Sequence, residues 1–126
     1  MKILWKKVRQ LSIKREVEQS KMDLYSVLIP TILSTEIFKN NRDIKELVDL
    51  LKVQDLKDYL YDSRTALLAR LIREIQKNNE EDLNFNINEF KKKSLDIIER
   101  KNLIEQSEIT GFINKYSRNN KGELDE

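Results

Sequence analysis

The chain has 126 residues, a length typical of one domain, with 39% apolar side chains, 37% charged side chains and a formal net charge of +2. It contains no histidine and no cysteine, which excludes Ser-His-Asp and Cys-His nucleophilic sites, zinc sites built from those ligands, and a disulfide framework. Two glycines and one proline are too few for the turns of a β-sandwich or barrel, so the composition predicts an all-α fold.

The amino-terminal part of the chain predicts two or three helices. A first helix is expected over about residues 3–22, where Leu4 and Val8 begin a stripe with helical spacing. Asp23 is expected to cap a second helix. Pro30 either begins a further helix at its first turn or kinks a continuing one.

The clearest helical pattern follows Asn41, which we expect to be its cap. The apolar side chains there repeat at i, i+3, i+4 and i+7, the spacing of one helix face. They are Ile44, Leu47, Val48 and Leu51.

A shorter helix is predicted over about residues 55–61, and Asp62 or Ser63 then caps a helix that ends near Asn78. Apolar residues cover well over half the circumference of that last helix. Such a helix lies at the centre of a fold or takes part in an interface, and we expect the helix of residues 63–77 at the centre.

Residues 80–88 alternate apolar and polar side chains but have no partner strand, so we expect a loop that pins Leu83, Phe85 and Ile87 onto the bundle. A long helix is then expected over about residues 88–106.

A final short helix is predicted over residues 109–116, and the polar composition after it predicts a disordered tail. The sequence thus predicts a single compact bundle of five to seven helices over residues 1–116, followed by a flexible polar tail over residues 117–126.

The residues predict no catalytic apparatus. Neighbouring acids such as Glu80 and Glu81 are expected to face water, and no acid stands squarely inside an apolar stripe, where a carboxylate Mg²⁺ site would need it. Gly111 and Gly122 stand alone, so there is no glycine-rich phosphate loop. We therefore expect a protein that is not an enzyme, with no catalytic, cofactor-binding or metal-binding residues and no small-molecule substrate.

The segment Asp55 to Ile75 superficially resembles a helix-turn-helix, in which Arg64 would read guanine. Two positions depart from that motif: Lys57 stands where a small residue is usual, and Tyr61 where glycine is usual. Ser63 as an N-cap explains the local sequence without DNA.

Arg70, Arg73 and Lys77 share one helix face and, with Arg64, form a candidate contact surface for nucleic acid or an acidic partner. The alternative is a solvated edge partly paired with Glu74. Two further basic clusters, over residues 91–93 and 6–9, have the same two interpretations. Convergence of the three clusters in the fold would favour nucleic acid.

Trp5 either docks the first helix on the bundle or anchors a partner, because tryptophan is enriched at binding hot spots. The apolar excess around Leu67 and Leu71 predicts a surface for a protein partner or for self-association. We therefore expect a small helical interaction protein, an accessory or adaptor subunit from a bacterial or phage system. The alternative is a helix-turn-helix DNA-binding regulator.

Location follows from the apolar stretches. The longest, over residues 27–33, is too short to span a bilayer, so we expect a cytoplasmic protein with no membrane partner.

Overall fold

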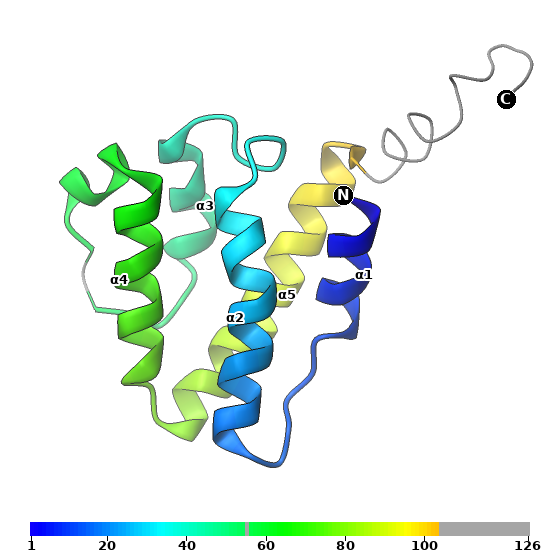
Figure 1. The fold of residues 1–126 in the computed structure, drawn as a ribbon, viewed down its shortest axis with the longest axis vertical. Helices are drawn as coiled ribbons and strands as arrows, with labels where there is room; N and C mark the ends of the chain where they lie inside the picture. The colour runs from blue at the N-terminus through cyan, green and yellow to red at the C-terminus, as the bar shows by residue number, and fades with distance from the viewer. Residues whose placement is uncertain (55, 104–126) are drawn as a thin grey trace, which may run out of the picture.

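The computed structural model describes residues 1–54 and 56–103. In that part of the chain every regular element is a helix, which confirms the predicted all-α fold. The α-helices are α1 (Lys2–Gln10), α2 (Val17–Leu33), α3 (Lys45–Val48), α4 (Arg64–Gln76) and α5 (Glu80–Arg100) (Figure 1). Two 3-10 helices, η1 (Asn41–Ile44) and η2 (Asp58–Asp62), precede α3 and α4. The short helix and the tail predicted after residue 104 lie outside the described residues.

Helix α2 occupies the centre of the fold. It packs against α1, α4 and α5, and Figure 1 shows α4 and α1 on either side of it with α5 crossing behind. Helix α4 packs mainly on α2 and η2, so the prediction that the helix of residues 63–77 is central was wrong. The reason is visible in α2 itself, which has no charged residue from Leu24 to Leu33 and can therefore be covered on several sides.

The core joins all five α-helices through side chains that are almost completely buried. Two phenylalanines, Phe38 after α2 and Phe90 in α5, are the largest of them, each 1% exposed. Fully burying an aromatic or branched side chain of this size stabilises a fold by roughly 1.5–3 kcal/mol, so these positions account for much of the driving force for folding.

The first helix is shorter than the predicted range of about residues 3–22: α1 ends at Gln10, and a loop over residues 11–16 leads to α2. Asp23 therefore lies inside α2 and does not cap a helix. Pro30 is also inside α2, which continues past it and ends at Leu33. Proline has no N–H to donate to the carbonyl of Ser26, so one bond of the helix is missing there, and α2 ends within a turn after it.

The clearest helical pattern of the sequence, from Ile44 to Leu51, forms a shorter helix than expected. It divides into η1 and the four-residue α3. The turn begins at Asn40, whose backbone N–H donates to a carboxylate oxygen of Asp43 at 3.0 Å. Ser63 caps α4 as predicted, since its Oγ accepts from the backbone N–H of Ala66 at 3.3 Å.

Helix α5 begins at Glu80, so the predicted loop over residues 80–88 was wrong. Leu83, Ile87 and Phe90 follow at i, i+4 and i+7 and are at most 1% exposed, whereas Phe85 is 38% exposed. Asn79 starts the helix by accepting from the backbone N–H of residue 82 at 2.8 Å. The alternating residues therefore lie in the first turns of a helix, and their period of two in the sequence does not indicate a strand or a loop.

Candidate interaction surface

Arg64 is held inside the fold. Its Nε donates to Asn41 Oδ1 at 3.0 Å, and its terminal nitrogens donate to three backbone carbonyls, those of Ile32 (3.3 Å), Ser34 (3.1 Å) and Phe38 (2.7 Å). These carbonyls belong to the carboxyl end of α2 and the loop after it, where a helix leaves acceptors without partners and carries partial negative charge. The guanidinium therefore joins α4 to the end of α2, and this geometry does not favour its predicted contact with nucleic acid.

Three lysines make contacts of the same kind between distant segments. Lys21 donates to the carbonyl of Gln76 at 3.0 Å, Lys91 to that of Leu11 at 2.8 Å, and Lys101 to that of Ile37. Two of these carbonyls lie at the carboxyl ends of α4 and α1, where a cation also meets the favourable end of the helix dipole. Many of the chain's cations are thus used to fasten the fold.

Glu74 lies in α4 with its side chain 2% exposed, between two of the predicted contact residues. It accepts from Arg70 Nε at 3.1 Å and from Lys77 Nζ at 3.2 Å, which confirms the pairing expected for a solvated edge. The expectation that no acid interrupts an apolar stripe was wrong. Leu67, Leu71 and Glu74 are spaced i, i+4 and i+7, a signal present in the sequence.

Glu74 and Lys77 border a cleft of about 440 Å³ between the loop after α3 and the turn before α5. Lys52 on the opposite wall lies 3.7 Å from Asp82, so the lysines on both walls already face acids. Beside it, the fully buried Asn86 accepts from the backbone N–H of Lys52 at 2.6 Å and donates to Asn78 Oδ1 at 2.8 Å. The cleft is therefore a junction whose charges are mutually satisfied. Among the described residues no group of three or more acids is placed to hold a metal ion.

The carboxyl of Glu74 makes the stability of the fold depend on pH in the acid range. Burial acts to raise the pKa of Glu74, but hydrogen bonds and charge from Lys77 and Arg70 outweigh it, so its pKa lies below the ordinary value of 4.5. A group whose pKa is lowered by folding adds stability that is complete above its unfolded pKa and is lost as the pH falls through its folded pKa.

We therefore expect Glu74→Gln to flatten the acid side of the stability curve. Below about pH 4.5 the free energy of unfolding of the wild type should fall more steeply than that of the variant. Urea denaturation at neutral and acid pH measures the difference, with Glu81→Gln, an exposed acid on α5, as the control. A gap between wild type and Glu74→Gln that is the same at both pH values would contradict this assignment.

The apolar residues predicted to meet a partner are not at the surface. Leu67 and Leu71 are both 0% exposed and belong to the core, so the expectation that they form a partner surface is corrected. Helix α4 buries one face on α2 and leaves mainly alanines and charged residues outside. Trp5 is half-buried against the core, with its indole N–H donating to Glu99 Oε2 at 3.3 Å.

The first fifteen residues hold a charge imbalance that the sequence analysis did not use. They contain six basic side chains, and the first acid of the chain is Glu16. On α1 these cations occupy the solvent side, because Val8 is buried while Lys6, Lys7 and Arg9 are exposed. We give the name α1 cationic surface to Lys6, Lys7 and Arg9 on α1 together with Arg15, which lies in the loop that follows the helix.

These cations lack the internal partners that other cations have. Within residues 1–54 and 56–103, Lys6, Lys7 and Arg15 form no ion pair. The guanidinium of Arg9 lies 4.7 Å from the centre of the Trp5 ring, a cation–π contact that leaves its charge without a carboxylate. Elsewhere in the described chain the exposed cations that contact neither an acid nor a backbone carbonyl are scattered, at Lys39, Lys57, Arg73 and Lys92.

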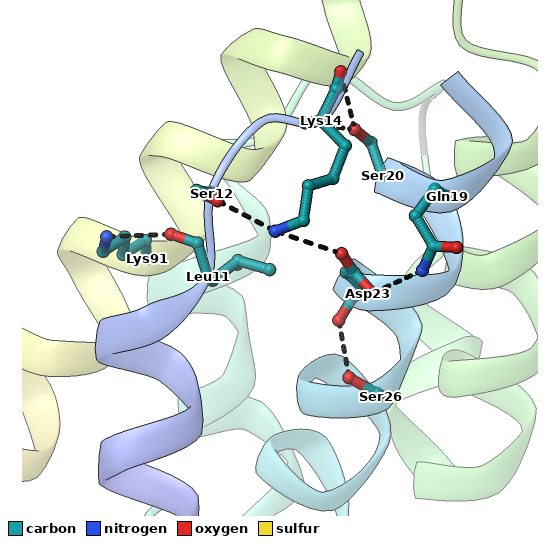
Figure 2. Close-up of polar contacts among 8 residues, drawn as sticks. All are labelled: Leu11, Ser12, Lys14, Gln19, Ser20, Asp23, Ser26 and Lys91. Carbon is teal, nitrogen blue, oxygen red and sulfur yellow. Dashed lines mark hydrogen bonds and ion pairs between the residues drawn. The ribbon is translucent and has the colours of Figure 1, made fainter. Parts of the chain in front are cut away.

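The loop after α1 holds the helix in place (Figure 2). Lys14 Nζ contacts Ser12 Oγ at 2.9 Å and Asp23 at 3.4 Å, and its backbone N–H donates to Ser20 Oγ at 2.8 Å. The bond from Lys91 to the Leu11 carbonyl fixes the other side of the loop. The α1 cationic surface is therefore presented on a helix tied to both α2 and α5.

The three basic clusters of the sequence converge in part. Helix α1 packs against α5, so the clusters over residues 6–9 and 91–93 adjoin. The third cluster, on α4, lies across α2 from α1 (Figure 1). Lys93 pairs with Glu46 at 2.9 Å, which leaves Lys92 as the cation that α5 adds beside α1.

No protein-family model matches the chain, and comparison with curated proteins and with solved structures finds no match either. Among the described helices, none combines the length and apolar character needed to cross a bilayer.

Proposed function

We propose that this protein is a small, non-enzymatic helical interaction protein of the cytoplasm that binds an acidic partner through the α1 cationic surface. The observation that carries the proposal is the concentration there of cations that pair with no acid of the described residues, on a helix whose opposite side is anchored in the core. Most other cations of the described chain neutralise an acid or a helix end. The cytoplasmic location rests on the absence of cysteine from the sequence.

Charge placement supports this reading physically. Cations that share one surface add their potentials, attract an opposite charge over about 8–10 Å at physiological salt and speed its encounter. The same charges dispersed over the molecule would largely cancel against neighbouring acids. Because the helix is already anchored, binding does not have to order the backbone that carries these cations, which lowers its entropic cost.

Heparin-affinity chromatography tests the proposal with a sulfated polymer as the acidic probe. The wild type should be retained and then released by salt, and the triple variant Lys6→Gln, Lys7→Gln, Arg15→Gln should elute at clearly lower salt.

The matched control is the triple variant Lys39→Gln, Lys57→Gln, Arg73→Gln, which removes two lysines and one arginine that also have no partner among the described residues but lie outside the α1 cationic surface. It should elute close to the wild type. Equal shifts in the two triple variants would show that net charge alone governs binding and would overturn the assignment to α1.

A further inference from the structure

The side chains beside the α1 cations indicate what the acidic partner is. Ile3 is 74% exposed, the highest value among the large apolar residues that the structure describes. It stands within one helical turn of Lys6 and Lys7 on the same exposed side of α1. An apolar side chain in that place gains nothing from water or from a purely polar partner.

The neighbouring part of α2 extends this apolar spot. Lys7 and Gln10 border a hollow together with Ser26, Val27 and Asp23, whose carboxylate pairs with Lys14, and α1 runs antiparallel to α2 beside it (Figure 1). The helical rise of 1.5 Å per residue then puts the start of α1 level with the last turns of α2. Two exposed apolar residues lie in those turns, Ile29 (37% exposed) and Leu33 (42% exposed).

We propose that the α1 cationic surface binds the surface of an anionic lipid bilayer, with Ile3 entering the boundary between headgroups and acyl chains. This inference rests on the proposed function and names the partner of the same surface. It replaces the expectation of no membrane partner, which considered only stretches long enough to span a bilayer. Helices that lie in the membrane interface combine lysine and arginine, at the level of the phosphates, with apolar side chains that reach below them. Clustered basic residues bind anionic leaflets by charge.

Nucleic acid fits this surface less well. Proteins that bind single strands stack bases on exposed aromatic rings, but the guanidinium of Arg9 lies over the Trp5 ring, and the indole N–H is tied to Glu99. Sequence-independent contact with duplex phosphates would leave Ile3 in water.

A protein partner fits less well too, because charged residues are depleted at the core of protein–protein interfaces, whereas this surface consists of cations around one exposed apolar side chain. The exposed apolar residues at this end of α1 and α2 are also few, whereas a standard interface takes about 800 Å² from each partner. Binding to an anionic bilayer does not require a complementary surface of that size, because the lipid headgroups present negative charge over the whole membrane surface.

Vesicle binding tests the inference, and the chain supplies its own probe. Trp5 is the one tryptophan of the sequence and lies on α1, so its fluorescence reports this helix alone. We expect the full-length protein to sediment with phosphatidylcholine vesicles that contain phosphatidylglycerol, to leave pure phosphatidylcholine vesicles unbound, and to change its tryptophan emission on binding.

Two kinds of variant separate the contributions of charge and insertion. The triple variant Lys6→Gln, Lys7→Gln, Arg15→Gln should bind about 100-fold more weakly, because each cation near an anionic bilayer strengthens binding about fivefold. Ile3→Ser should weaken vesicle binding about tenfold and leave heparin elution unchanged. Tyr59→Ser removes a residue that is 64% exposed on η2, which packs on α4 and η1, and should bind as the wild type does.

The outcomes distinguish the inference from the proposed function. Retention on heparin without binding to anionic vesicles would overturn the bilayer partner and leave the acidic partner standing. Tighter binding to duplex DNA than to vesicles at the same salt would also overturn it, in favour of nucleic acid. Loss of both heparin and vesicle binding would overturn both proposals, and an Ile3→Ser variant that binds vesicles as the wild type does would contradict insertion.

Discussion

Replacing Arg64 by alanine is expected to lower the free energy of unfolding by about 3 kcal/mol, because three backbone carbonyls and Asn41 lose a charged donor at once. Losing these hydrogen bonds should weaken the packing of α4 on the end of α2 more than it lowers the helix content of either element. Urea denaturation followed by circular dichroism measures the difference between variant and wild type.

Two further variants define the cause of the Arg64 effect. Arg64→Lys keeps the charge but not the planar fork of donors, so it should recover part of the stability and not all of it. Arg73→Ala, on the exposed side of the same helix, should stay within about 0.5 kcal/mol of the wild type. A stable Arg64→Ala that had instead lost binding to duplex DNA would restore the nucleic-acid role predicted from the sequence.

Leu71→Ala should destabilise the protein by about 3–4 kcal/mol, the usual range for a leucine truncated in a packed core. Leu71 is 0% exposed where α4 meets the rest of the bundle, so the surroundings cannot close over the cavity without moving α4. Thermal or urea unfolding measures the loss.

The control for Leu71→Ala is Met22→Ala, which truncates an exposed apolar residue and should change stability little. A Leu71→Ala variant as stable as the wild type, but with altered self-association, would show that Leu71 serves an interface after all.

Helical periodicity predicted the class of fold because burial in α-helices follows spacing along the chain. Around Phe85 the period-two alternation overlies the helical spacing of Leu83, Ile87 and Phe90, so the same residues fit both periods and the predicted loop was wrong. The position of α4 failed for another reason. Apolar content measures how much of a helix can be buried, but which helix becomes central depends on pairing among all of them.

The candidate site could be predicted less well than the fold, because a basic residue looks the same in sequence whether it is exposed or used internally. Arg64 was predicted as a contact residue, yet its acceptors come from residues 32–41, which sequence spacing cannot bring to it. The imbalance over residues 1–15 was visible in the sequence. Its meaning depends on knowing that acids from elsewhere in the described chain do not neutralise Lys6 and Lys7.

The most direct test of the account is a residue-level map of where an acidic probe touches the protein. Nuclear magnetic resonance of the ¹⁵N-labelled full chain, titrated with a short heparin oligosaccharide, provides it. We expect the amide shifts of residues 2–15 to change first and most, with smaller changes near Lys92. Changes centred on Arg70, Arg73 and Lys77, or spread evenly over the molecule, would contradict the α1 cationic surface as the binding site.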